Sequence, residues 1–328
     1  MIDLILLSRA IIFSSLLTLL SIGLTLTYLT TKVPNFAHGS FAAVGAYVTL
    51  TVVKLWNGNP YYSILLGLAV CGLTALVQYF IVFRPLMRRG ATIVGLMITT
   101  LAMEFILSAV LNIYADYLTR VFKIRSRYFL FSSYDVKIAG QRGLLFVSPS
   151  LVAITFVLLF LALTRTRFGV AMRATIENPA LASVVGINVN LVYAVSWFIA
   201  GALGGLSGTL LPLWFPGNPD MGTLLIVSIF AASTVGGVYS IYGAVLGGFL
   251  IGLAEILGTS YLATLVGAWV IPYRPLIPLL AIVITLLVIP SGIAGVDWRA
   301  LPGKAKGLAT IFRRITGSED VPSSINGT

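Results

Sequence analysis

The chain has 328 residues, of which 58% are hydrophobic and 9% are charged. Soluble domains carry about 25% charged residues, so 21 Lys and Arg with 10 Asp and Glu are too few to cover a surface that faces water. This composition excludes a soluble enzyme, a nucleic-acid-binding protein and a secreted disulfide scaffold, and it leaves a protein embedded in the lipid bilayer. The formal net charge of +11 then indicates topology and contact with anionic headgroups.

Long apolar runs predict an all-α fold, a polytopic transmembrane helical bundle of about 8–9 spans. A helix needs about 20 apolar residues to cross the hydrocarbon, whereas a barrel strand would alternate over about 10 residues. Glycines and prolines interrupt the last runs, so we expect short or broken helices there. The expected spans are 11–29, 36–53, 61–83, 91–114, 144–164, 191–214, 223–242, 243–262 and a last one that ends at 289.

The distribution of Lys and Arg predicts the orientation. An outside N-terminus places 12 of the 21 basic residues on the cytoplasmic side, in agreement with the positive-inside rule. We expect a multi-pass plasma-membrane protein with its C-terminus in the cytoplasm. Its transmembrane domain covers 1–295, with an external loop at 115–143 and a cytoplasmic segment at 165–190, and a basic, partly disordered tail covers 296–328. In the external loop, 128–131 and 136–139 are expected to pair as a small hairpin.

The sequence predicts no catalytic residue and no metal ligand. It holds one histidine, so a His-based metal cluster is excluded, and its few acidic residues form no paired carboxylates. It has no GxxxxGK[ST] motif, so the chain cannot bind and hydrolyse ATP alone. We therefore expect its chemistry to be recognition and movement of a solute.

Four polar residues are candidates for a substrate pathway: Asn35, His38, Ser40 and Glu104. The first three lie at the start of the second span, just after Pro34, where a helix N-terminus offers free N–H groups to an anion such as a carboxylate. Glu104 lies in the middle of a span, where a carboxylate is costly and suggests function. The structural alternatives are that Asn35 only caps the helix, that His38 bonds a neighbouring helix, and that Glu104 is protonated or paired.

Residues 165–190 form an amphipathic segment that suggests a docking helix across the membrane face. Pro179 suits the first turn of a helix capped by Asn178, and Gly186 suits its end. A long inter-span loop would explain the mixture of charge and periodicity less well. The candidate coupling residues are Arg167, Phe168, Gly169, Arg173, Glu177, Asn178, Pro179 and Gly186.

Glycines at four-residue spacing predict close helix packing, because small residues let helix backbones approach each other. A sliding interface that opens and closes a pathway would use the same spacing. The paired glycines are Gly201 with Gly205, Gly204 with Gly208, Gly243 with Gly247, and Gly248 with Gly252.

Several sequence blocks together resemble a known family. They are N-F-A-H-G-S-F at 35–41, R-T-R-F-G-x-x-M-R-A at 165–174, V-G-G-x-x-S-I-x-G-A-V-L-G-G at 235–248 and I-P-S-G-I-x-G at 289–295. Each block is weak alone, but their order and spacing resemble the permease of the branched-chain amino acid ABC importers, of the H-type (LivH-like), over about 11–295.

The resemblance implies a transport subunit rather than an enzyme, with branched-chain or other apolar amino acids as its solutes. It implies four kinds of partner: a second (M-type) permease subunit, two cytoplasmic ATP-binding subunits, an extracytoplasmic substrate-binding protein and the lipid bilayer. ATP and Mg²⁺ would bind only to the partner subunits, and no cofactor is expected in this chain. It also implies that 165–188 docks into the ATP-binding subunits.

Three alternatives stay open from the sequence. The same family could carry urea, amides or another small polar solute. An ion-coupled secondary transporter or channel that acts alone would need several intramembrane ionisable residues, and Glu104 alone is thin support for it. A purely structural membrane scaffold fits the composition but leaves the predicted docking helix unexplained.

Overall fold

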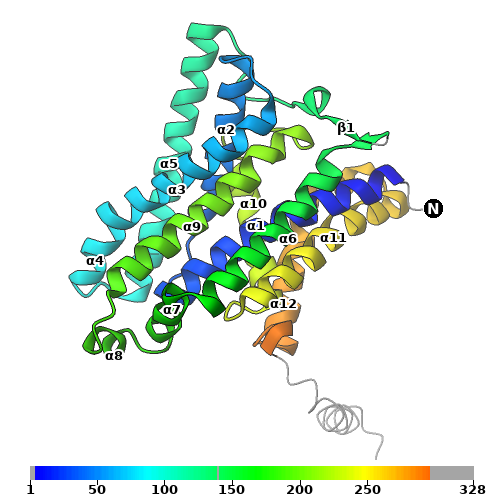
Figure 1. Ribbon diagram of the computed structural model, residues 1–328. Helices are drawn as coiled ribbons and strands as arrows, with labels where there is room; N and C mark the ends of the chain where they lie inside the picture. The colour runs from blue at the N-terminus through cyan, green and yellow to red at the C-terminus, as the bar shows by residue number, and fades with distance from the viewer. Residues whose placement is uncertain (1–3, 139, 296–328) are drawn as a thin grey trace, which may run out of the picture. The chain divides into compact units, whose positions relative to one another are not determined.

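The computed structural model describes residues 4–138 and 140–295, and the tail predicted at 296–328 lies outside them. Within this part, residues up to Ala294 form one compact unit, shown in Figure 1. A π-helical turn, η2 (Tyr79–Phe83), joins the third and fourth helices. The α-helices are α1 (Leu4–Thr31), α2 (His38–Lys54), α3 (Ser63–Gln78), α4 (Arg84–Arg88), α5 (Ile93–Phe122), α6 (Leu144–Arg165), α7 (Arg167–Glu177), α8 (Pro179–Val184), α9 (Val189–Leu210), α10 (Met221–Gly236), α11 (Ile241–Val266) and α12 (Leu276–Val288).

The all-α polytopic prediction is confirmed. The described residues contain seven helical segments long and apolar enough to cross a membrane, and a helix lies at each of the expected spans. α2 has 17 residues and α10 has 16, about 26 and 24 Å at 1.5 Å per residue. Both are shorter than the hydrocarbon thickness of about 30 Å, and each follows a stretch of non-helical backbone, 32–37 before α2 and 214–220 before α10.

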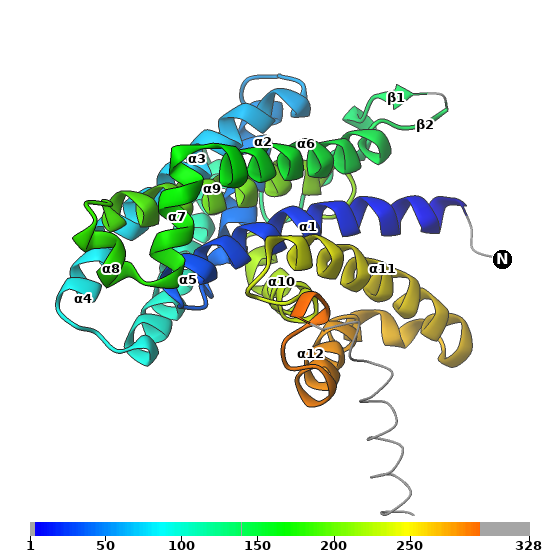
Figure 2. The same ribbon diagram turned by 60° about the horizontal axis from the view of Figure 1, so that its bottom comes forward.

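Helices α1 and α9 form the centre of the bundle. α1 packs against α6, α9 and α11, and α9 packs against α2 and α3; Figure 2 shows α1 running between α6 and α11. The core face of α1 carries small hydroxyl residues that bond to their own helix: the hydroxyls of Ser14 and Thr18 donate to the carbonyls four residues earlier, at 2.6 and 2.7 Å. These hydroxyls are therefore satisfied without a partner helix.

The paired glycines of α9 and α11 lie where other helix backbones come closest. Gly205 faces Gly67 and Cys71 of α3, and Gly208 faces Ala42 of α2, each so closely that an added Cβ would collide with backbone atoms or a side chain. On α11, a Cβ at Gly248 would lie 2.5 Å from the Cα atom of Thr18. Glycine at these positions therefore sets the distances between the central helices.

The loop between α5 and α6 differs from the expected hairpin. The two strands are β1 (Lys137–Ile138) and β2 (Gln141–Arg142), with Lys137 opposite Arg142. The segment 128–131, expected to pair with 136–139, instead contacts the stretch before α10, where Phe129 bridges Gly217 in antiparallel fashion. A Cβ at Gly217 would lie 2.5 Å from the Phe129 ring, so the small residue decides this pairing.

The amphipathic segment after α6 forms two helices rather than one. α7 begins where the Thr166 hydroxyl accepts the N–H of Gly169 at 3.1 Å. α8 begins at Pro179, where the Asn178 side chain accepts the N–H of Leu181 at 3.0 Å. α8 ends before Gly186, which has φ +86°, a conformation that favours glycine.

We expect Gly208→Ala to destabilise the protein, because its Cβ would collide with the backbone of Ala42 on α2, where no rotamer change relieves the contact. Overpacking of this kind costs about 1–3 kcal/mol. The measurement is thermal unfolding of the purified full-length chain in detergent. Gly95→Ala is the control, because its nearest neighbour is the Thr92 hydroxyl at 3.4 Å and alanine favours a helix by up to about 1 kcal/mol. Equal unfolding midpoints for the two variants would contradict the packing argument.

Candidate functional site

A row of polar side chains runs along α5 at every fourth position: Thr100, Glu104, Ser108, Asn112 and Asp116. Residues four apart are neighbours on the helix surface, and each step turns about 40° around the axis, so the row forms one polar stripe that winds slowly along α5. Within the bilayer such groups must face other protein groups or a water-filled cavity. The stripe therefore identifies the side of α5 that is turned away from lipid.

Glu104 is the buried centre of this row. Its Oε2 accepts a hydrogen bond from the Ser40 hydroxyl of α2 at 2.5 Å, and its Oε1 accepts one from the Thr223 hydroxyl of α10 at 2.9 Å. Ser40 is buried with it, whereas Thr223 is exposed. The carboxyl group thus joins α5 to two neighbouring helices, because one oxygen bonds α2 and the other bonds α10. Such hydrogen bonds are strong when the acceptor is ionised.

The two segments that supply these hydroxyls have the same local structure. In each, an asparagine side chain accepts the main-chain N–H two residues later: Asn35 at 3.1 Å and Asn218 at 3.0 Å. A glycine follows four residues after each asparagine, and these glycines, Gly39 and Gly222, lie backbone to backbone. The hydroxyl residue comes next in both segments. Two Asn-x-x-x-Gly-[Ser/Thr] segments therefore meet on one carboxyl group.

This arrangement rules out one of the expected roles of Asn35. The structural alternative to its predicted pathway role was that it caps the second span, but α2 begins at His38 with Ala37 in the capping position and no side-chain bond to the helix start. Asn35 instead stabilises the turn before the helix, and its Nδ2 atom is buried without a hydrogen-bond partner among the described residues. Asn35 does not cap α2 because the chain makes one extra turn between Pro34 and the first residue of that helix.

His38 lies away from the Glu104 cluster. Its Nε2 is 2.9 Å from the carbonyl oxygen of Leu20 on α1, and because a carbonyl only accepts, Nε2 carries the proton. The ring packs against Gly23, where a Cβ would come within 2.8 Å of it. His38 thus contacts a neighbouring helix, which was the structural alternative to a pathway role.

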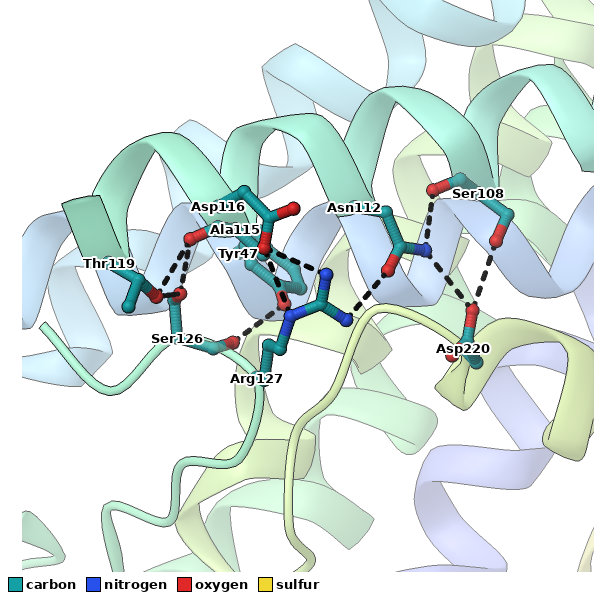
Figure 3. A network of polar contacts seen from close by, with 9 residues as sticks. All are labelled: Tyr47, Ser108, Asn112, Ala115, Asp116, Thr119, Ser126, Arg127 and Asp220. Atoms are coloured by element: carbon teal, nitrogen blue, oxygen red, sulfur yellow. Dashed lines mark hydrogen bonds and ion pairs between the residues drawn. The ribbon is translucent and has the colours of Figure 1, made fainter.

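The polar row of α5 continues into the loops, as Figure 3 shows. Asp220, just before α10, accepts hydrogen bonds from Ser108 at 3.1 Å and from Asn112 at 3.3 Å. Arg127 forms an ion pair with Asp116 at 2.8 Å and donates to Asn112 at 3.3 Å. The start of α10 and the loop after α5 are therefore both bonded to one side of α5.

A second set of bonds in Figure 3 fixes the loop after α5 to the bundle. The Tyr47 hydroxyl of α2 donates to the Ser126 carbonyl at 2.7 Å, and the Ser126 hydroxyl donates to the Ala115 carbonyl at 2.5 Å. The Thr119 and Ser126 hydroxyls are 2.6 Å apart. The loop that carries Arg127 is thereby held beside the polar row.

The candidate coupling residues lie on α7, α8 and their boundaries. Gly169 is buried against the backbone at the end of α6, and the Arg173 guanidinium donates to the Leu163 carbonyl. The exposed members are Arg167, Arg173, Glu177, Asn178, Pro179 and Gly186.

Sequence reasoning identified Glu104 and Ser40 but missed Thr223, Asp220 and the rest of the α5 row. Two signals were present in the sequence: the four-residue spacing of polar residues along the span, and the repeated pattern at 35–40 and 218–223. Among the described residues, no group of three or more His, Cys, Asp or Glu lies together to hold a metal ion.

Comparison with known proteins decides the family. The family described as "Branched-chain amino acid transport system / permease component" matches residues 6–289. The chain belongs to this family. It is therefore a multi-pass membrane protein and a transport subunit.

Individual relatives agree with this family over most of the chain. A protein of Methanocaldococcus jannaschii named a probable branched-chain amino acid transport permease protein LivH is 45% identical over 90% of this chain and 93% of its own. The high-affinity branched-chain amino acid transport system permease protein LivH of Escherichia coli is 26% identical over 88% of this chain and 94% of its own. A nucleoside ABC transporter permease protein, NupC of Lactococcus lactis, is 34% identical over 32% of this chain and 34% of its own.

We expect Ser40→Ala and Glu104→Gln to be coupled energetically. Ser40→Ala leaves one oxygen of a buried carboxylate without its donor, which costs about 1–3 kcal/mol. In the Glu104→Gln background the same change costs less, by a coupling energy of about 0.5–1.7 kcal/mol. The measurement is a double-mutant cycle on the unfolding of the purified permease. Ser150→Ala is the matched control, because that hydroxyl bonds only within α6, to Phe146, and its effect should be additive with Glu104→Gln. Additivity in the Ser40 cycle as well would refute the coupling.

Proposed function

We propose that this permease is the membrane-spanning subunit of an ATP-binding-cassette importer that moves branched-chain or other apolar amino acids into the cell by alternating access. The observation that carries the proposal is the end-to-end likeness to a protein named as a branched-chain amino acid permease, at 45% identity over 90% of the chain. A second (M-type) permease subunit, two ATP-binding subunits that hold ATP and Mg²⁺, and an extracytoplasmic substrate-binding protein complete the importer.

Helix α8 is proposed as the surface that receives movement from the ATP-binding subunits. Three apolar residues of α8 and its C-terminal end face outward: Leu181, Val184 and the capping residue Val185 are 62%, 81% and 70% exposed. The preceding helix, α7, carries the exposed charged residues Arg167, Arg173 and Glu177 and packs against α8. An exposed apolar patch with a polar rim is typical of a protein interface. Basic residues in this segment suit the cytoplasmic side of the membrane. These observations support the orientation with an outside N-terminus and a cytoplasmic 165–190 segment.

The polar row of α5, with Ser40 and Thr223, is proposed as one wall of the solute pathway. Thr223 and Asp220, at the start of α10, are exposed, although Thr223 bonds the buried Glu104 and Asp220 bonds Ser108 and Asn112 of the same row. Exposed polar groups in a transmembrane bundle need water or a second protein surface. A pathway between this face and the second permease subunit would provide both.

Uptake by the reconstituted importer tests the function. Proteoliposomes that hold the permease pair and ATP-binding subunits, with the binding protein outside and ATP inside, should accumulate leucine at least tenfold above liposomes without ATP. Unlabelled leucine should compete with labelled leucine, and urea should not. Competition by urea or by a nucleoside would support another solute of the same family, the latter as in the name of NupC. Transport by the permease without any ATP-binding subunit would favour a secondary transporter or channel and would contradict the proposal.

We expect Val184→Glu to lower leucine uptake and substrate-stimulated ATP hydrolysis at least tenfold, because it places a charge in the proposed docking patch. Membrane insertion and yield should stay normal, since the residue is 81% exposed. Val136→Glu is the control, a similar change at a residue that is 48% exposed in the loop between α5 and α6. Normal transport by the Val184 variant would refute the docking role.

The same two positions report the orientation. Cys71, the one cysteine of the chain, is buried, so Val184→Cys and Val136→Cys add accessible thiols to a protected background. A membrane-impermeant maleimide should label position 136 in intact cells and position 184 only in opened cells. The reverse pattern would overturn the orientation.

A further inference from the structure

A buried ion pair joins α11 to the segment before α12. Glu255 of α11 is 3% exposed, and its Oε1 accepts the Nε hydrogen of Arg274 at 2.6 Å. Arg274 lies in the short segment between η5 (Ala268–Tyr273) and α12, which folds back along α11. An ionisable pair inside a membrane bundle is costly and indicates function.

Both charges of this pair have hydrogen-bonding capacity left over. Glu255 Oε2 is buried and has no hydrogen-bond partner within 3.5 Å, although the Ser228 side chain lies beside the carboxyl group. Among the described residues the hydrogen bonds of Arg274 use only its Nε atom, so the two terminal nitrogens are left over. The guanidinium plane lies 4.1 Å from the centre of the Phe13 ring, which holds it in place.

A cavity of about 280 Å³ opens at this pair. Its polar lining comes from Glu255, Arg274 and Asn218, and apolar side chains such as Phe13, Phe215 and Leu224 form the rest. Ligand pockets usually measure about 300–1,000 Å³ and combine apolar walls with a few polar groups. At about 280 Å³ this cavity is just below that range, a size that suits a single small molecule.

We propose that this cavity binds one apolar α-amino acid as a zwitterion, and that it is a subsite of the permease itself. The ligand carboxylate bonds the terminal nitrogens of Arg274, and its ammonium bonds Glu255 Oε2. The four charges then alternate around a ring with no net charge, which offsets the cost of burying them. The hydrocarbon side chain occupies the apolar walls. This assignment rests on the proposed amino acid import, but direct binding tests it separately from transport.

The site lies away from the Glu104 cluster. Asn218 connects the two, because its side chain stabilises the turn before α10 and also lines the cavity. In the proposed orientation this end of α11 faces the outside, so the subsite would receive the amino acid from the binding protein before the pathway opens.

Direct binding of labelled leucine to the membrane complex, without the binding protein, tests the site. The permease pair with its ATP-binding subunits is placed in nanodiscs of phosphatidylglycerol and measured by scintillation proximity. Two analogues compete for the site: 4-methylpentanoate, which lacks the ammonium group, and isoamylamine, which lacks the carboxylate. We expect Glu255→Gln to weaken the binding of leucine and of isoamylamine at least tenfold. The binding of 4-methylpentanoate should be unchanged. Arg274→Lys should weaken the binding of leucine and of 4-methylpentanoate and leave the binding of isoamylamine unchanged.

A second variant keeps the ion pair and fills the cavity. Leu224→Trp should abolish leucine binding, and Leu250→Trp, at an exposed position of α11 outside the cavity lining, should leave it unchanged. The assignment would be overturned if both charge variants weakened the binding of all three ligands equally, or if Leu224→Trp bound leucine normally. Either result would overturn it even if ATP-driven leucine uptake is observed. Loss of wild-type leucine binding in nanodiscs that contain phosphatidylethanolamine would also overturn it, because the occupant would then be a zwitterionic lipid headgroup.

Discussion

The close contact of Gly39 with Gly222 is the constraint on which the arrangement of this permease depends. A side chain at either position would collide with the backbone of the other segment. Because neither has one, the first turns of α2 and α10 can meet inside the bundle, and Ser40 and Thr223 reach the two oxygens of Glu104. The buried carboxyl group then accepts a hydrogen bond from each hydroxyl.

This contact also explains why α2 and α10 are short. Each follows a non-helical stretch that enters the bundle, and such backbone is stable at membrane depth only where protein or a water-filled cavity surrounds it. Here Asn35 and Asn218 satisfy main-chain N–H groups in these stretches. The close packing of α9 through Gly205 and Gly208 brings α2 and α3 around them.

Besides the Asp116–Arg127 pair, three other places in the described chain carry charged residues that the proposed transport would use. The Glu255–Arg274 pair lies in an apolar cavity between α10, α11 and the fold-back before α12. Glu104 joins α2, α5 and α10, and the exposed charges of α7 belong to the helix that precedes the apolar patch of α8. A two-state change that tilts α10 would alter the first two together, since Asn218 and Thr223 lie at its start. Only an interaction that differs between the states can drive such a change.

The sequence by itself determined the helical spans, the turn and cap at Asn178–Pro179, and the family, because run length, hydropathy and capping are local properties. It identified Ser40 and Glu104 as polar residues in unusual places but not as partners. The tertiary structure alone decided that Thr223 completes the cluster, that His38 bonds α1, that Phe129 pairs with Gly217 and that Arg274 reaches Glu255. The physical reason is that these contacts depend on which helix faces approach most closely, and small residues far apart in the chain fix that approach jointly.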